Sequence, residues 1–409
     1  MWPGHKRSST PAYRAVFDVG ATSVGVGVSR TTKTGDELLW HSRLDYPYRA
    51  YSDYERYERT MYATLLELGM KLTSEGLPAV RDADRAFSAS SMVVAFVVTP
   101  PWFYGGVATT SYIKDTPFTA TQTILEKLHT KGVSEILSRH DFASWEDIMG
   151  SHELMEHVDQ AVLLEGYPVR AWEGKTIKEF TLTGYYAIAG STVIHQVRTI
   201  LERVLPNHHS EGYTSTRLLG ELYRTAMWDG ATSQAIFVEV FGQVTAVVTM
   251  RKGMMRHVRT IPVGTDRILR SVAPKAISAK EAESKLDILL GKEDPKQADK
   301  DETDIPEELR DAVDEWHAAV QEEIMAQSDG VTPPELILLM ADTRWHELLM
   351  AVLSRPFLAP GVREERSFTV QPCSTFILAS HEGVDVPAGA IRDVRLQVFA
   401  HTIGACAQA

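Results

Sequence analysis

The chain has 409 residues, of which 44% are hydrophobic and 23% are charged, so it is an ordinary globular sequence long enough for roughly two or three domains. Its formal net charge is −12 and no basic stripe is interleaved with aromatic residues, which disfavours nucleic acid as a partner. There is no secretory signal, no apolar run of the ~18 residues that a membrane span needs, and only two cysteines; we therefore expect a cytoplasmic protein with no transmembrane segment.

The first predicted elements are two strands joined by a tight turn in residues 15–30, which read AVFDVGATSVGVGVSR. Gly20 can adopt positive φ and turn backbone N–H groups toward one point, where Thr22 and Ser23 add hydroxyl donors. Asp18 ends the first strand and carries the kind of carboxylate that holds a hydrated Mg²⁺ beside phosphates. The stretch predicts either a phosphate-binding hairpin or an ordinary glycine-rich β-hairpin.

Three further elements complete this N-terminal region. Residues 36–48 alternate enough to form a third strand, which makes a meander with the first two. Apolar residues at helical spacing predict a helix over 53–76, with Gly76 as its stop signal. A buried strand follows over 92–99.

The segment 101–210 has the pattern of an α+β unit set into the chain. It predicts a helix over 120–140, two strands over 159–190 and an amphipathic helix over 191–206. The sequence HELMEH at 152–157 invites a zinc-protease interpretation, but its histidines are five positions apart, whereas a helical zinc pair needs i, i+4 spacing. We therefore expect a surface helix there instead.

The opening hairpin has a second copy in the second half of the chain. After a helix over 216–229, residues 234–264 read strand, turn, strand, turn, strand. Both copies end an apolar strand on an acid, Asp18 in the first and Glu239 in the second, and continue into a glycine-bearing turn. Such an internal repeat predicts two lobes of like fold that face each other.

Three stretches match, in order, those of one known superfamily. FDVGATSVGVGV is similar to its first phosphate hairpin; residues 253–291, with their Ile-Pro-Val-Gly turn and following helices, track the stretch after its second hairpin; and 101–210 stands where one branch carries an inserted subdomain. The C-terminal DVRLQVFAHTIGACAQA resembles the closing helix that returns to the first lobe. The chain thus resembles the actin-like ATPase superfamily and, within it, the FtsA/PilM branch of cell-division and type IV pilus assembly proteins.

This resemblance implies an α/β protein with the two-lobed actin-like ATPase fold. The first lobe would span 1–100 and be completed by 376–409, an α+β subdomain would be inserted at 101–210, and the second lobe would span 211–375. ATP and Mg²⁺ would lie between the hairpins, with Asp18 as the metal ligand. The implied nucleotide-binding residues are Asp18, Gly20, Ala21, Thr22, Ser23, Glu239, Gly242, Thr245, Ala341 and Asp342.

The second hairpin departs from the family's pattern of an Asp, a hydrophobic residue, a Gly, a small residue and a Thr pair. Here Glu239 is the acid, Phe241 stands at the first glycine and Val244 replaces a hydroxyl. Phenylalanine at that position blocks the approach of backbone to phosphate. On the adenosine side, Ala341 and Asp342 stand where the family has a pair of glycines. The carboxylate of Asp342 repels phosphates unless Mg²⁺ intervenes. We therefore expect a weak or degenerate ATP site, with Phe241 packed into the space for phosphate.

The resemblance and its departures imply a cytoplasmic scaffold that recruits protein partners at the inner face of the membrane, in cell division or type IV pilus assembly. The chain ends without the amphipathic helix that tethers cell-division members to lipid, which favours the pilus-type relative and a short cytoplasmic peptide of a membrane protein as its partner. Self-association is compatible with the resemblance. The alternative is an active ATPase or small-molecule kinase, but no catalytic acid for one is evident over 80–110.

Overall fold

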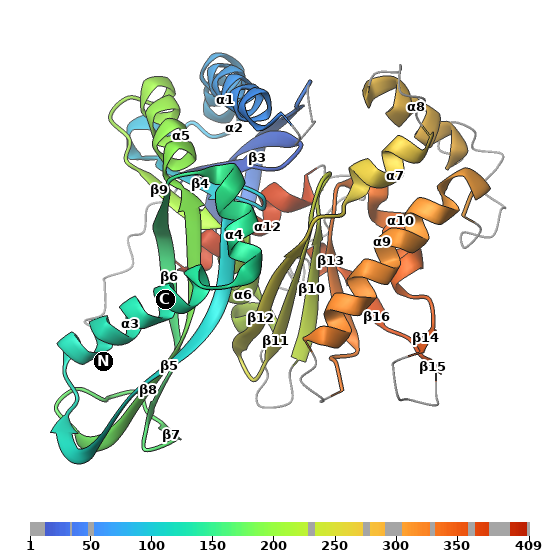
Figure 1. Ribbon diagram of the computed structural model, residues 1–409. Coiled ribbons are helices and arrows are strands. Elements are labelled where there is room, and N and C mark those ends of the chain that lie inside the picture. The colour runs from blue at the N-terminus through green and yellow to red at the C-terminus, as the bar shows by residue number, and fades with distance from the viewer. Residues whose placement is uncertain are drawn as a thin grey trace.

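Two five-stranded sheets organise the part of the chain that the structure describes (Figure 1). The computed structural model describes residues 13–32, 35–47, 53–227, 234–272, 279–290, 305–327, 332–358, 365–375 and 393–406.

The first sheet has the strand order β3–β2–β1–β4–β9. Its antiparallel meander consists of β1 (Tyr13–Val19), β2 (Ser23–Thr32) and β3 (Gly35–Asp45). On the other side of β1 lie β4 (Val93–Val98) and β9 (Ser210–Thr214), both parallel to it. Because β1 is covered on both faces, all its residues are buried and it reads as a continuous apolar run around Asp18.

The second sheet repeats this topology with the order β12–β11–β10–β13–β16. The meander is β10 (Gln234–Val240), β11 (Thr245–Arg251) and β12 (Met254–Ile261), and the parallel strands are β13 (Leu336–Met340) and β16 (Thr369–Pro372). The central strand of each sheet begins its own hairpin, as the repeat in the sequence predicts. The two-lobed α/β fold is therefore confirmed.

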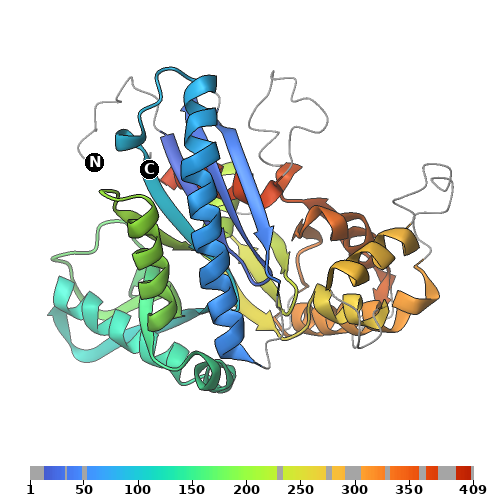
Figure 2. The same cartoon turned by 90° about the horizontal axis from the view of Figure 1, so that it is seen from above.

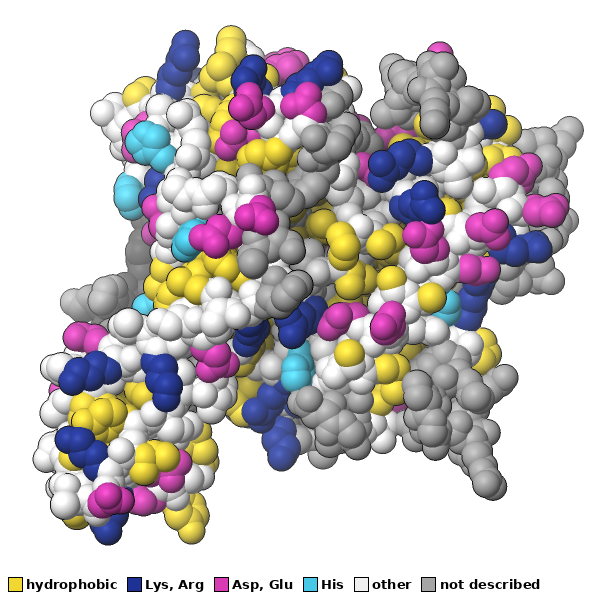
Figure 3. Space-filling view, viewed as in Figure 1, with side chains coloured by type: hydrophobic (Ala, Val, Ile, Leu, Met, Phe, Trp, Pro, Cys, Tyr) yellow, Lys and Arg dark blue, Asp and Glu magenta, His cyan; other side chains and the backbone are white. Residues whose placement is uncertain are grey.

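A third, fully antiparallel sheet projects from the first lobe in the order β5–β8–β6–β7 (Figure 1). Its strands are β5 (Phe103–Thr119), β6 (His152–Leu164), β7 (Tyr167–Pro168) and β8 (Thr176–Gly190). These strands all fall within 101–210, the segment interpreted from the sequence as an insertion. Figure 3 shows hydrophobic side chains beside lysines and arginines on its projecting end.

The surface helix expected at 152–157 is wrong, because these residues begin β6. The preceding helix, α4 (His140–Met149), ends at Gly150, whose φ of 67° with ψ of −128° is a backbone conformation that glycine adopts readily. The chain then pairs with β8 along its whole length, and two β-bulges disturb the alternation that would have marked a strand in the sequence.

The helical stop expected at Gly76 is also wrong. Helix α1 (Tyr54–Lys71) continues through a π-helical turn, Leu72–Gly76, into α2 (Leu77–Ala83). Gly76 keeps helical backbone angles, and a Cβ there would lie 2.7 Å from Cε3 of Trp40. The glycine therefore serves a close approach between helix and β3.

Helices cover both lobes. α5 (Ser191–Val204) lies beside α1 over the first sheet (Figure 2), and α12 (Val394–Cys406) contacts β1, β2, β3 and α6 (Ser215–Leu222). The outer face of the second sheet packs against α7, α9 and α10. The second-lobe helices are α7 (Thr265–Val272), α8 (Ala279–Leu289), α9 (Glu307–Ala326) and α10 (His346–Leu353).

The remaining described elements are short, apart from α3 (Gln122–Leu137), which lies on the inserted sheet. They are the turns at Ala89–Ser91, Tyr223–Met227 and Thr343–Trp345, and the pair β14 (Phe357–Leu358) with β15 (Glu365–Arg366).

The limits of the lobes and of the insertion stay predictions of the sequence. Residues 376–392, in the segment expected to complete the first lobe, lie outside the described residues. None of the described helices is long and apolar enough to cross a lipid bilayer.

Candidate functional site

The two hairpins expected to bind phosphate have turns with the same backbone closure. In the first, the N–H of Gly20 donates to the carbonyl of Ser23 at 3.0 Å; in the second, the N–H of Phe241 donates to the carbonyl of Val244 at 2.9 Å. Phe241 therefore occupies in the second lobe the place that Gly20 occupies in the first.

Asp18, the residue expected to hold Mg²⁺, is fully buried between two arginines. Nη2 of Arg43 lies 2.6 Å from one carboxylate oxygen and Nη2 of Arg395 lies 3.1 Å from the other. Arg43 also donates to Asp393 at 2.7 Å and to the hydroxyl of Ser23 at 2.8 Å. Both oxygens of Asp18 thus already have a cationic partner, and its charge is neutralised within the chain.

Sheet register explains how Arg43 reaches Asp18. Asp18, Gly25 and Arg43 form one cross-strand row on the same face of β1, β2 and β3. Strands about 4.8 Å apart place the ends of such a row about 10 Å apart, within reach of an extended arginine. A Cβ at Gly25 would lie 2.6 Å from Nη2 of Arg43, so the missing side chain leaves the path that the guanidinium takes.

Asp393 belongs to this cluster and also caps the N-terminus of α12. Its carboxylate accepts the backbone N–H of Leu396 at 3.1 Å, as an N-cap residue does. Burial acts to raise the pKa of Asp393, but the charge and hydrogen bond of Arg43, the N–H of Leu396 and the charge of Arg395 together hold that pKa below the ordinary value. The cap sets Arg395, the second residue of the helix, beside Asp18.

Apolar contact fills the space between the two hairpin turns. Phe241 is buried against Ala21 of the first hairpin and Val244 of its own. The guanidinium of Arg395 lies over the ring, 4.6 Å from its centroid, in a cation–π arrangement. Phe241 therefore lies between the two hairpin turns, in contact with the first one.

The two turns also touch at Gly242, and the start of α7 is bonded to the second turn. A Cβ at Gly242 would lie 2.2 Å from Cγ2 of Thr22, so the two turns touch. The first N–H groups of α7, those of Thr265 and Asp266, donate to the carbonyls of Phe241 at 2.9 Å and Gly242 at 2.7 Å. Donors that a helix N-terminus can offer to an anion are here bonded to the turn.

Aromatic residues of the first lobe hold the first turn from behind. The carbonyl of Gly20 accepts from the hydroxyl of Tyr46 and from the indole of Trp102, both at 2.8 Å, and the carbonyl of Ala21 accepts from the hydroxyl of Tyr57. These bonds fix the turn in a single position.

Thr245, expected to face phosphate, points into the second lobe. Its hydroxyl donates to the carbonyl of Val263 at 2.7 Å and accepts from the indole of Trp316 at 3.0 Å. It therefore serves the packing of α9 on β11.

Glu239 is the least satisfied charged group at the junction. It is fully buried; Oε2 accepts from Ser215 at 2.8 Å, and Oε1 has no hydrogen-bond partner among the described residues. Burial raises the pKa of Glu239 to about 7, against the opposing influence of Arg395 and Ser215 and with a further contribution from Asp18. Near neutral pH this carboxyl is therefore partly protonated.

A cleft of about 370 Å³ lies between the lobes beside the hairpins. Of the nucleotide-site residues inferred from the sequence, Thr22, Ala341 and Asp342 line it, whereas Asp18, Glu239 and the others do not. Five acids and three arginines are among its lining residues, and these are Asp45, Asp266, Glu283, Asp342, Asp393, Arg43, Arg344 and Arg395.

The arginines of this cleft are all ion-paired. Besides Arg43 and Arg395, Arg344 pairs with Glu283 at 2.9 Å and with Asp287 at 3.3 Å. An incoming triphosphate would have to displace these carboxylates and meet an excess of negative charge.

No family model matches the sequence, and no curated protein matches it. The chain is similar in structure to a chain of the PilM–PilN type IV pilus biogenesis complex, with a TM-score of 0.56 and 10% identity over 98% of this chain and 99% of that one. It has the actin-like ATPase fold.

More distant likenesses have lower scores. They include the ethanolamine utilization protein EutJ from Carboxydothermus hydrogenoformans (TM-score 0.42, 10% identity, 95% of this chain and 90% of that one). Another is the inorganic polyphosphate/ATP-glucomannokinase from Arthrobacter sp. strain KM (TM-score 0.37, 12% identity, 97% and 100%). These two likenesses are too distant to bear on function.

Within this actin-like fold, the residues at the hairpins do not fit Mg²⁺-ATP. The acid for the metal is paired with Arg43 and Arg395, Phe241 fills the space between the turns, and the helix donors are bonded to backbone.

The sequence analysis missed Arg43, Arg395 and Asp393. Arg43 could have been found from the sequence, because its strand pairs with the strand in which glycine alternates with valine. In that pairing Arg43 stands opposite Gly25. Arg395 carries only a weak signal, a cation in the otherwise apolar face of the C-terminal helix.

We expect Asp18→Asn to lower the free energy of unfolding by about 3–5 kcal/mol, because it leaves two buried guanidinium groups without their shared anion. Urea unfolding measures the change. The matched control is Glu37→Gln, which breaks the more exposed pair with Arg30 and costs at most about 1 kcal/mol. A stabilising effect of Asp18→Asn would instead indicate a vacant cation site in which acids repel.

We expect Glu239→Gln to change the pH dependence of stability. The folded-state pKa of about 7 exceeds the unfolded value of 4.5, so the native state holds a proton that the unfolded state releases between these values. Wild-type stability falls as pH rises through this window, by about 3 kcal/mol from this group, and the variant lacks that fall.

The measurement for Glu239 is the difference between wild-type and variant unfolding free energies from pH 4.5 to 8. Glu67→Gln, on the exposed face of α1, is the control and leaves the profile unchanged. Parallel profiles for wild type and Glu239→Gln would contradict the assignment.

Proposed function

We propose that this chain is a cytoplasmic actin-fold scaffold of PilM type, which recruits a membrane-associated protein partner and does so without nucleotide. The observation that carries the proposal is the buried cluster of Asp18, Arg43 and Arg395 beneath hairpin turns that touch each other. Recruitment needs surfaces and a stable shape, and neither requires turnover.

Electrostatics support the absence of nucleotide. A Mg²⁺ ion approaching Asp18 would meet two guanidinium groups, and both must leave before the carboxylate can accept a ligand. Leaving costs several kcal/mol, because Arg395 then loses its buried carboxylate partner and Arg43 keeps only Asp393. Phosphate would also have to displace the ring of Phe241 from Ala21.

Contacts between the insertion and the second lobe support a fixed arrangement. Gln160 of β6 bonds both the N–H and the carbonyl of Met255 in β12, at 2.6 and 3.2 Å. Asp141 of α4 accepts from Arg259 at 2.5 Å. These contacts hold the lobes together at a second place, away from the hairpins.

The partner is proposed from the likeness to a chain of the PilM–PilN complex, which covers nearly all of both chains. By analogy with that complex, the occupant is a membrane protein's short cytoplasmic segment, in type IV pilus assembly rather than cell division. We place its docking site at the border of the insertion with the first lobe.

That border has a rigid base. Glu156 of β6 is buried and accepts the backbone N–H of Thr214 and the guanidinium of Arg217, each at 2.9 Å. Leu154 of β6, two positions before Glu156, is 42% exposed, and Val93, at the start of β4, is a second partly exposed hydrophobic side chain (40%).

Millimolar ATP with Mg²⁺ should shift the unfolding temperature of the wild-type protein by less than about 1 °C. A site saturated a hundredfold over its Kd would instead add about 2.7 kcal/mol, or several degrees. Thermal unfolding with and without ATP–Mg²⁺ measures this, and turnover assays complete it. Saturable binding of ATP–Mg²⁺ in the micromolar range, abolished by Asp18→Ala, would contradict the nucleotide-free proposal and favour an ATPase or kinase.

A photo-crosslinking residue at Leu154 or Val93 should capture an integral membrane protein when the cells are irradiated. Ile288 on α8, an exposed hydrophobic side chain of the second lobe, is the control position and should not capture it. Mass spectrometry identifies the products. Capture of soluble metabolic enzymes alone, or equal capture at all three positions, would count against the docking site.

A further inference from the structure

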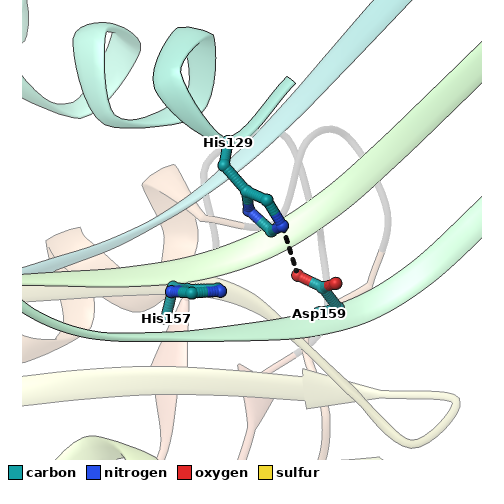
Figure 4. A group of neighbouring side chains, drawn as sticks. All are labelled: His129, His157 and Asp159. Atoms are coloured by element: carbon teal, nitrogen blue, oxygen red, sulfur yellow. Dashed lines mark ion pairs between the residues drawn. The ribbon is translucent and has the colours of Figure 1, made fainter. Parts of the chain in front are cut away.

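Two histidines and an aspartate gather on the helix-covered face of the inserted sheet (Figure 4). His157 and Asp159 are two positions apart on β6, so they share one face, and His129 descends from α3 above them. One potential ligand atom from each side chain lies within 4.8 Å of the other two. Nothing in the proposed scaffold role uses this cluster.

Local sequence explains why these residues meet. Gly132 follows His129 by one helical turn, and a Cβ there would lie 2.5 Å from the ring of Tyr186 on β8. The glycine lets α3 approach the sheet closely. Gly184 stands opposite Asp159 in the ladder and projects no side chain into the space beside the carboxylate.

The ring of His129 is oriented from behind. The hydroxyl of Tyr186 lies 3.4 Å from Nδ1, which leaves Nε2 directed at Asp159 (Figure 4). The ring of His157 lies 4.5 Å from that of His129, centroid to centroid. Metal-ligating histidines commonly have a partner on the second ring nitrogen, which sets ring direction and tautomer.

The spacing suits a metal better than a hydrogen bond. Nε2 of His129 and Oδ1 of Asp159 are 3.5 Å apart. An N–H···O hydrogen bond is typically about 2.9 Å. Two ligand atoms at about 2.1 Å from a tetrahedral Zn²⁺ are about 3.4 Å from each other.

We propose that His129, His157 and Asp159 bind one divalent transition-metal ion of the zinc type, through two imidazole nitrogens and one carboxylate oxygen. A fourth position stays open to water, because Asp159 is 38% exposed and His157 is exposed too, which also provides the entry path. Imidazole and carboxylate ligands suit Zn²⁺ and its neighbours, whereas Mg²⁺ and Ca²⁺ prefer oxygen alone.

The bound ion would fasten α3 to β6. Because α3 otherwise lies on β5 and β8, the ion would add a link to β6 and stabilise the insertion against local unfolding. His152, from the HELMEH stretch, is not a ligand, because its Nδ1 lies 3.1 Å from Glu146 of α4.

Calorimetric titration of the full, chelator-stripped chain with Zn²⁺ tests the proposal. We expect one tight site per chain, a tetrahedral absorption spectrum with Co²⁺ as the probe, and a raised unfolding temperature that EDTA reverses. Asp159→Asn and His157→Ala should each weaken Zn²⁺ binding at least about tenfold. His152→Ala is the matched control and should leave the affinity unchanged.

Both variants change exposed side chains, so their unfolding temperatures in EDTA should match that of the wild type. Asp159→Asn keeps the shape of the side chain and decides the question if His157→Ala folds poorly. The proposal fails if Zn²⁺ does not bind, or if the two variants bind it as tightly as the wild-type chain does.

Discussion

The carboxylate of Asp18, held between the guanidinium groups of Arg43 and Arg395, is the interaction on which the rest of this structure depends. It joins the first strand to the third and to the C-terminal helix. Arg395 extends the connection to the second lobe through the ring of Phe241. Buried charges are tolerated only as a paired set, so none of these elements can shift without exposing an uncompensated charge.

This constraint changes what an actin-like fold can do. Where a ligand fills the space between two hairpins, the distance between the lobes can change when the ligand binds or leaves. Here Ala21 and Phe241 fill that space, and Gln160 and Met255 bind the insertion to the second lobe. A ligand shifts an equilibrium only by its differential affinity for two states. A chain that supplies both sides of the contact itself favours one state, which agrees with a scaffold.

Local patterns predicted most of the fold, because each lobe repeats a short, strongly apolar hairpin unit with an acid at the same place. Prediction failed where distant residues decided the outcome. Asp18 and Arg395 are 377 residues apart, and no local pattern links them. Gly76 was predicted to end a helix, but it serves the close approach of Trp40. At 152–157, β-bulges interrupt the alternation by which a strand is recognised in a sequence.

The structural role of a glycine is the hardest to infer from the sequence. A missing side chain lets backbone approach a phosphate, and it equally lets another side chain pass. Gly25 does the second, since Arg43 crosses the space over it to reach Asp18. An acid followed by alternating glycines therefore identifies the hairpin without identifying its ligand. At this hairpin the cations beside the acid are Arg43 and Arg395, and both belong to the chain itself.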